Sequence, residues 1–140
     1  MKERNVSVVF VVDDEVVIAQ TLAMILERNG YSVRFFTDPL EALTNVEIDR
    51  PDLLISDVVM PQLSGIDLAV EVKTRCSDCK ILLFSGQAHT HHLLRDPGVQ
   101  AHHFTVLPKP IHPADLLREI HQVKTLSCEL STPSAPVPSA

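Results

Sequence analysis

The chain is 140 residues long, the size of one folded domain with a short tail, so a core can form without disulfides or a structural metal. Its formal charge of −6 argues against nucleic acid or an anionic membrane as the main partner, since both attract basic surfaces, and favours binding of a divalent cation. No apolar run reaches transmembrane length, no signal peptide is recognisable, and the cysteines number three, so we expect a cytoplasmic protein without a disulfide framework.

Residues 6–12 form a β-branched, almost wholly apolar run, the pattern of a strand that is covered on both faces. The run ends in two carboxylates, Asp13 and Asp14. Apolar residues then recur at helical spacing from Val16 to Asn29, where Asn29-Gly30 supplies a stop signal. The sequence therefore predicts a strand, an acidic turn and a helix.

A second short strand is predicted over 31–36, and a helix start follows it. In Asp38-Pro39-Leu40-Glu41 the first carboxylate can cap the helix, and proline occupies the first helical position. The residues expected to face the sheet from this helix are Leu40, Leu43 and Val46. Arg50-Pro51 is expected to end it.

After Asp52 comes the next apolar run, of strand length, which ends in a lone carboxylate, Asp57, and Pro61 prevents the strand from simply continuing. A charge at the end of a buried strand is costly unless a metal, a cation or a chemical use offsets it. The stretch from Gln62 to Gly65 has turn chemistry. The buried face of a third helix is marked by Leu68, Ala69, Val72 and Cys76.

Residues 80–84 form another continuous apolar strand, which ends in Ser85-Gly86. The segment from Gln87 to Arg95 predicts a short, weak helix, and Asp96-Pro97-Gly98 is expected to end it early.

A fifth strand is predicted over 104–107, and Pro108 places it at a sheet edge because proline donates no ladder hydrogen bond. The last helix is expected to begin at Pro113 and to carry one apolar stripe as far as Val123.

Five strands alternating with five helices predict an α/β fold, with a parallel sheet wound on both faces. We assign residues 1–126 to this domain and 127–140, rich in Ser, Pro and Ala, to a disordered tail. No output domain is recognisable, so we expect the protein to act through a partner.

Polar side chains follow four of the predicted strands: Asp13 and Asp14, then Asp57, Ser85 and Lys109. The carboxyl ends of parallel strands lie at one edge, where doubly wound sheets bind ligands, so these side chains should converge. Three carboxylates repel one another there unless a hard, oxygen-seeking cation such as Mg²⁺ and the lysine ammonium offset their charge.

The chain resembles the receiver domain of bacterial two-component response regulators over about residues 6–124. The motifs that carry the likeness are the acidic pair Asp13-Asp14, Asp57 followed by Met60-Pro61 and Gly65, Ser85-Gly86, and Lys109-Pro110. The resemblance implies a stand-alone receiver with a flavodoxin-like fold and sheet order 2-1-3-4-5. It also implies a central aspartate that accepts a phosphoryl group from the phosphohistidine of a histidine kinase or a histidine phosphotransfer protein.

The resemblance also implies a role for each site residue. Asp57 is the expected phosphoacceptor. Asp14, Asp57 and the backbone carbonyl of Val59 are the expected direct Mg²⁺ ligands, with Asp13 holding the metal through water.

Lys109 is expected, on the same resemblance, to pair with a phosphoryl oxygen, and the Ser85 hydroxyl to hydrogen-bond another. Such a protein phosphorylates and dephosphorylates itself, so we do not expect a turnover enzyme. Its downstream protein target is not named by the sequence.

The chain departs from the family pattern near this site. Val106 stands where family members usually carry Tyr or Phe, and Phe104, on the same strand face, is the candidate substitute. Val59 offers no side-chain amide or carboxylate to orient an attacking water, so we expect a long-lived phosphoryl group, with Gln87 as a partial replacement. Because the helix over 87–95 is expected to be short, signalling is expected to depend on its ordering.

Two alternative functions remain open. A pseudo-receiver would bind partners without phosphorylation, although the intact acids and lysine argue against it. A Mg²⁺ phosphohydrolase of the haloacid-dehalogenase kind would share an aspartyl-phosphate intermediate, but it needs a second acid two residues after the nucleophile, where Val59 stands.

Two further groups of residues have metal-like spacing. Cys76 and Cys79 match a metal or redox pair, but Cys76 falls on the apolar stripe of the third helix, so we interpret them as buried and structural. The histidines His89, His91, His92, His102 and His103 are interpreted as solvated residues rather than a metal or pH-sensing patch.

Overall fold

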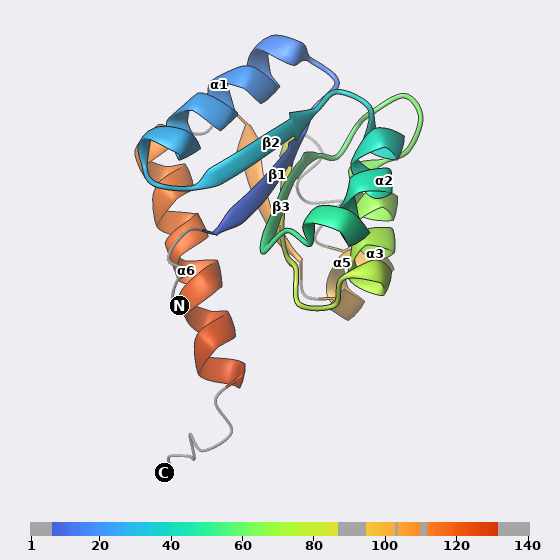
Figure 1. Cartoon of the computed structure of the whole chain (residues 1–140). Helices are drawn as coiled ribbons and strands as arrows, with labels where there is room; N and C mark the ends of the chain where they lie inside the picture. The colour runs from blue at the N-terminus through green and yellow to red at the C-terminus, as the bar shows by residue number, and fades with distance from the viewer. Residues whose placement is uncertain (1–6, 87–94, 103, 110–111, 132–140) are drawn as a thin grey trace. The chain divides into compact units, whose positions relative to one another are not determined.

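The computed structural model describes residues 7–86, 95–102, 104–109 and 112–131, with side chains of the last helix described as far as Val123. Within these ranges the chain forms one parallel five-stranded sheet of order β2-β1-β3-β4-β5, together with five helices (Figure 1). The predicted doubly wound α/β fold and its strand order are confirmed.

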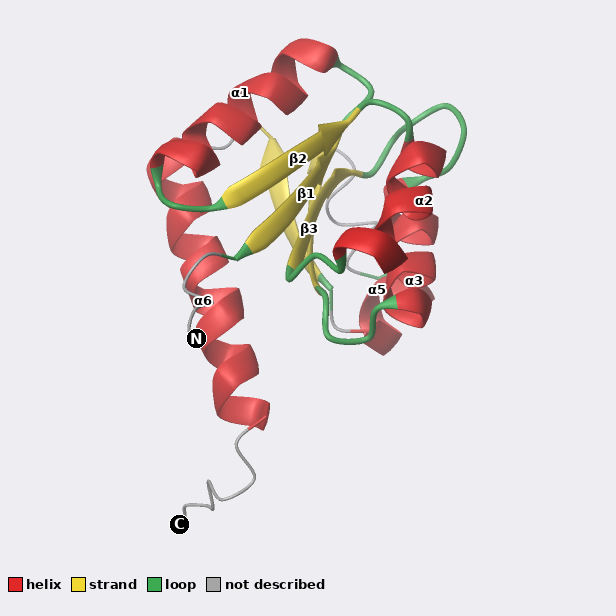
Figure 2. Ribbon diagram, viewed as in Figure 1, coloured by secondary structure: helices red, strands yellow, loops and turns green. Residues whose placement is uncertain are grey.

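The strands are β1 (Val8–Val12), β2 (Ser32–Phe36), β3 (Leu53–Asp57), β4 (Lys80–Gly86) and β5 (Thr105–Lys109). The helices are α1 (Val16–Arg28), α2 (Pro39–Asp49), α3 (Gly65–Arg75), α5 (Pro97–His102) and α6 (Pro113–Ser131). α1 covers one face of the sheet, and α2, α3 and α5 lie on the other (Figure 2).

The central strands are apolar because neither of their faces meets water. In β1, every residue from Val9 to Val12 is buried, and Leu53 to Ile55 of β3 are buried as well. A half-exposed strand would alternate apolar and polar residues, whereas a strand covered on both faces needs a continuous apolar run. The expectation for the first strand is thus confirmed.

α2 begins as the sequence predicts but buries a slightly different face. The Asp38 carboxylate accepts a hydrogen bond of 2.9 Å from the Leu40 backbone N–H, and proline fills the first helical position. The prediction that Leu40 faces the sheet is wrong, because its side chain is exposed. The buried stripe is Pro39, Ala42, Leu43 and Val46, at helical spacing counted from the proline.

The same residues that were expected to end a preceding helix, Asp96-Pro97-Gly98, begin α5, a helix that was not predicted from the sequence. The Asp96 side chain accepts hydrogen bonds from the backbone N–H groups of Gly98, at 2.8 Å, and Val99, at 3.4 Å, and Pro97 is the first helical residue. This is the cap-plus-proline start seen at α2. The weak helix predicted over 87–95 lies almost wholly outside the described residues.

The position of β5 and the start of α6 agree with the predicted elements, whereas α6 extends further than its predicted apolar stripe. β5 stands last in the order of the described strands and pairs there only with β4, which confirms its edge position. α6 begins at Pro113, where His112 Nδ1 accepts a 3.1 Å hydrogen bond from the Ala114 N–H, and it continues past Leu126 to Ser131. Residues 132–140 of the expected tail lie outside the described residues, and the domain boundary at 126 stays a prediction.

None of the helices in the described part of the chain is both long enough and apolar enough to cross a membrane.

Candidate functional site

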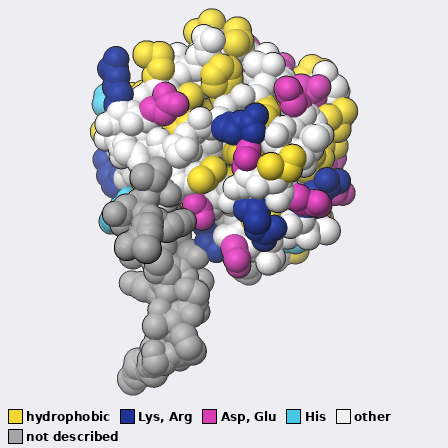
Figure 3. Space-filling model, viewed as in Figure 1, with side chains coloured by type: hydrophobic (Ala, Val, Ile, Leu, Met, Phe, Trp, Pro, Cys, Tyr) yellow, Lys and Arg dark blue, Asp and Glu magenta, His cyan; other side chains and the backbone are white. Residues whose placement is uncertain are grey.

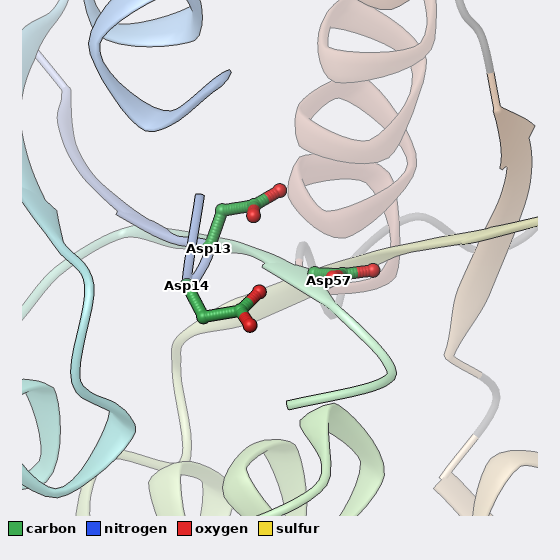
Figure 4. A group of neighbouring side chains, drawn as sticks. All are labelled: Asp13, Asp14 and Asp57. Carbon is green, nitrogen blue, oxygen red and sulfur yellow. The ribbon is translucent and has the colours of Figure 1, made fainter. Parts of the chain in front are cut away.

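Three carboxylates converge at the carboxyl edge of the sheet because β1 and β3 are neighbours. The register pairs Val12 with Ser56, so the residues that follow each of them, Asp13 and Asp57, end adjacent strands. One oxygen from each of Asp13, Asp14 and Asp57 lies within 4.8 Å of the others (Figure 4). The predicted convergence of these acids is confirmed.

Lys109 reaches the same point from the end of β5. Its Nζ lies 3.0 Å from Asp57 Oδ1 and 3.6 Å from Asp13 Oδ2. Burial acts to lower the pKa of Lys109, but the hydrogen bond to Asp57 and the charges of both carboxylates outweigh it and raise this pKa above its ordinary value. The lysine is therefore held as an ammonium group at neutral pH.

Asp13 occupies the most demanding position of the three acids. Its side chain is 1% exposed, and its Oδ1 accepts a 2.9 Å hydrogen bond from the Glu15 N–H. Its buried Oδ2 has no hydrogen-bond partner among the described residues. Burial raises the pKa of Asp13, and the Glu15 hydrogen bond and Lys109 only partly oppose that rise. The hydrogen-bond donors and the cation around Asp13 therefore do not fully compensate the negative charge of the site.

The donor set fits a hard divalent cation. All three acids offer carboxylate oxygens, the ligands that Mg²⁺ and Ca²⁺ prefer. Three carboxylates against one ammonium leave an excess of two negative charges, which matches a divalent ion. The buried Asp13 Oδ2 is an acceptor that a metal-bound water could satisfy. Val59 lies just after β3 in an exposed loop, and the expected use of its carbonyl stays a prediction.

Gly65 holds the backbone of Asp57 in place, a role that sequence reasoning missed by treating it as ordinary turn chemistry. The Gly65 N–H donates a 2.7 Å hydrogen bond to the Val58 carbonyl. A Cβ atom on Gly65 would lie 2.1 Å from the Asp57 carbonyl oxygen, so only glycine fits. The available signal was glycine, a poor helix former, at the first residue of a helix.

Ser56 is a second residue missed from sequence. It is fully buried in β3, and its hydroxyl donates a 2.8 Å hydrogen bond to the Asp57 carbonyl oxygen. The Asp57 backbone carbonyl thus accepts a hydrogen bond from Ser56 and lies close to the first residue of α3, and both features limit how far this backbone can move.

Ser85 lies at the same end of the sheet as Asp57. The β3–β4 register pairs Asp57 with Phe84, and the β4–β5 register pairs Gly86 with Lys109. Ser85 is buried, and its hydroxyl donates a 2.9 Å hydrogen bond to the Gly86 carbonyl. Its expected contact with a phosphoryl oxygen stays a prediction.

The position of Phe104 differs from what the sequence indicates. It precedes β5 rather than lying within it, and it is buried and stacked on His102 with ring centroids 5.1 Å apart. Val106 is the partly buried residue of β5 at the position usually held by an aromatic. A buried, stacked ring is a poor candidate for a freely reorienting side chain.

The cysteine pair behaves as a structural element of the core. Cys76 and Cys79 are both free and buried. Burial raises the pKa of the Cys79 thiol to about 12, which disfavours the thiolate needed for metal binding or redox exchange. Of the histidines, His102 stacks on Phe104, and His89, His91, His92 and His103 lie outside the described residues.

A doubly wound parallel sheet whose carboxyl edge gathers three acids and a lysine defines a receiver-type α/β domain. The family model described as the response regulator receiver domain matches residues 9–121, and the chain belongs to this family. It is thus a receiver domain of a two-component response regulator.

Curated relatives agree with this assignment. The chain is 35% identical over 112 residues to the response regulator MprA of Mycobacterium leprae, covering 80% of this chain and 48% of that protein. It is also 35% identical over 109 residues to MprA of Mycobacterium tuberculosis H37Rv, covering 78% of this chain and 46% of that protein. The chain therefore spans about half the length of these relatives.

Solved structures show the same fold. The CheY-like receiver domain protein of Methanospirillum hungatei JF-1 superposes with a TM-score of 0.81 at 22% identity, covering 91% of this chain and all of that one (100%). The chemotaxis protein CheY4 of Vibrio cholerae superposes with a TM-score of 0.75 at 29% identity, covering 84% of this chain and 98% of that one.

Proposed function

We propose that Asp57 accepts a phosphoryl group from the phosphohistidine of a histidine kinase or a histidine phosphotransfer protein in the cytoplasm, in a Mg²⁺-dependent reaction. Phosphorylation then changes binding to a downstream protein. The observation that carries this proposal is the Lys109 ammonium 3.0 Å from Asp57, beside two further carboxylates. The protein acts as a self-phosphorylating and self-dephosphorylating acceptor rather than as a turnover enzyme.

In the proposed step, a carboxylate oxygen of Asp57 attacks phosphorus. The phosphorus–nitrogen bond of the donor breaks, and the imidazole nitrogen keeps the electron pair. No general base is required because an aspartate is ordinarily ionised near neutral pH.

The remaining site residues stabilise charge on the phosphoryl group. Such transfers spread negative charge over the equatorial oxygens, so catalysis is mainly positioning and electrostatics. Lys109 lies where it can pair with one oxygen, and the Ser85 hydroxyl can rotate to donate to another. A bound divalent cation would supply further neutralisation among Asp13, Asp14 and Asp57.

The direct test is to treat the protein with acetyl phosphate and Mg²⁺ and to measure its intact mass. We expect a mass increase of one phosphoryl group that disappears in Asp57→Asn and when Mg²⁺ is omitted. Labelling of Asp57→Asn as strong as that of the parent would overturn the assignment of Asp57. Absence of labelling in the parent would favour the pseudo-receiver alternative.

A further inference from the structure

The outer edge of β2 presents unpaired backbone groups. β2 pairs with β1, and the part of the chain that the structure describes supplies no strand on its other side (Figure 1). The Ser32 N–H bonds the Ser7 carbonyl at 2.9 Å, and the Phe36 carbonyl accepts from the Asp13 N–H at 3.1 Å. Because backbone direction alternates along a strand, the N–H and C=O groups of Val33 and Phe35 point to the outer edge.

A groove of about 410 Å³ lies beside this edge, between α1 and β2. It is lined by Gln20, Ala23, Met24, Glu27, Val33, Arg34 and Phe35. Met24 is 52% exposed and Phe35 is 39% exposed, so the apolar part of the lining is open to water. On this side of the molecule, yellow apolar side chains reach the surface among charged ones (Figure 3). We call the outer edge of β2 and this groove together the edge groove.

The same two residues provide the outward-facing backbone groups and part of the lining of the groove. Val33 and Phe35 turn their backbone groups outward and also line the groove with their side chains. A segment that hydrogen-bonded to this edge would therefore place alternate side chains next to Phe35 and Met24. This is the arrangement by which extended peptides add to a sheet, with backbone bonds for affinity and a pocket for selection.

The charges of the edge groove favour a basic occupant. Arg34 is already neutralised, because it pairs with Asp49, donates a 3.0 Å hydrogen bond to Asn45 and lies over the Phe36 ring. Glu27 makes no ion pair with any residue that the structure describes, and the whole chain carries a charge of −6. The uncompensated charge of the groove is therefore negative.

We propose that the edge groove binds an extended segment of a partner protein, which pairs with β2 as an added strand, inserts an apolar side chain beside Met24 and Phe35, and places Lys or Arg near Glu27. A second copy of this chain fits less well. Two chains of charge −6 repel, and the Arg34 that a second copy would bring to this edge is already paired with Asp49. This binding does not require phosphorylation of Asp57.

The test uses a blocked synthetic peptide in which lysine alternates with valine and leucine, with binding followed by fluorescence anisotropy and by backbone amide shifts of the protein. We expect saturable binding with shifts in residues 32–36 and along α1. A control peptide with serine in place of the apolar residues keeps the charge, and a second with alternate N-methylated amides loses the backbone donors. Both controls should bind at least about tenfold more weakly, since each lacks one source of affinity.

Matched variants then locate the site. Phe35→Thr replaces an exposed ring by a small β-branched residue that suits a strand. Met24→Lys changes an exposed position of α1, so this variant remains informative if Phe35→Thr fails to fold. Each should weaken the apolar peptide by about tenfold, whereas Ile48→Thr, an exposed apolar residue of α2, should leave binding unchanged. Equal binding by both variants and the parent, undiminished binding of the serine peptide, or concentration-dependent dimerisation through β2 would overturn the proposal.

Discussion

Asp13 is costly to the fold because it is nearly fully buried and its Oδ2 lacks a hydrogen-bond partner among the described residues. Its raised pKa means that the folded state binds this proton more readily than the unfolded state does. Ionised Asp13 therefore destabilises the fold above its folded-state pKa, and this penalty is relieved as pH falls toward the ordinary value of 3.8. A bound cation would remove the same penalty at neutral pH.

Asp13→Asn should therefore stabilise the metal-free protein at pH 7. The asparagine oxygen can still accept the hydrogen bond from the Glu15 N–H, while the buried charge is lost. In EDTA, we expect the unfolding free energy of the variant to exceed that of the parent by about 1 kcal/mol at pH 7, and this gain should shrink toward zero near pH 4. Adding Mg²⁺ should raise the Tm of the variant much less than that of the parent. Urea unfolding at the two pH values measures the first effect, and thermal unfolding with and without Mg²⁺ measures the second.

The matched control for this variant is Asp14→Asn, because Asp14 is exposed and offers an oxygen to the same site. It should weaken Mg²⁺ binding without the gain in stability. A loss of stability in metal-free Asp13→Asn at pH 7 would contradict the account of Asp13.

Val59 provides a second prediction at the scale of one residue. Its side chain is 66% exposed two positions after Asp57, so an amide there can reach water without disturbing the core. Val59→Asn should shorten the lifetime of the phosphorylated protein by about tenfold or more, because a positioned polar group promotes attack by water. Loss of the phosphoryl mass with time measures this rate.

Val17→Asn, which adds the same amide to an exposed position of α1, should leave the lifetime unchanged. Gln87, the expected partial replacement for a polar residue at 59, lies outside the described residues. Rapid loss of the phosphoryl group from the parent protein in isolation would show that Val59 does not limit hydrolysis.

At the scale of elements, the approach of α3 to the end of β3 shapes the site. Gly65 begins α3 directly against the Asp57 carbonyl, and Ser64 caps the helix by accepting a 3.1 Å hydrogen bond from the Asp67 N–H. Alanine is normally the better helical residue by about 1 kcal/mol. Here the contact with β3 reverses that preference.

Gly65→Ala should lower the unfolding free energy by about 3 kcal/mol and slow phosphorylation, because a Cβ 2.1 Å from the Asp57 carbonyl must push the two elements apart. Gly98→Ala is the matched control near the start of α5. Its nearest contact, 3.2 Å, is to the end of the Asp96 side chain, so it should cost far less. Equal losses in urea unfolding would show that helix propensity, rather than the close contact, decides the outcome.

The elements also show which features of the fold and the site can be predicted from the sequence. Asp13, Asp57 and Lys109 were predicted to converge because parallel strands bring their carboxyl ends to one edge, whatever the details of packing. The start of α5 at Pro97 was missed because the same residues can end one helix and begin another. The contacts of Gly65 and Ser56 with the Asp57 peptide depend on how α3 and β3 pack, which no local pattern encodes.

At the scale of the whole molecule, the question is how a change at Asp57 reaches a distant surface. β4 is paired with both β3 and β5, and its end carries Ser85 beside the acidic site. α5 contacts α3, is capped by Asp96 and is closed by a 3.1 Å hydrogen bond from the Phe104 N–H to the Val99 carbonyl. A helix of six residues has little stability of its own, so small changes around it shift its opening.

Phosphorylation should therefore change amide hydrogen exchange in α5, and the expected direction is slower exchange as the segment becomes ordered. The measurement compares amide exchange before and after treatment with acetyl phosphate and Mg²⁺. We expect exchange over 97–102 to slow severalfold, whereas exchange at the end of α1 near Arg28, away from Asp57, should stay unchanged. Asp57→Asn, treated in the same way, separates phosphorylation from the effect of the metal alone. If phosphorylation is complete by mass and exchange over 97–102 is unaltered, the signal does not pass through α5, and the altered pattern at Val106 needs another explanation.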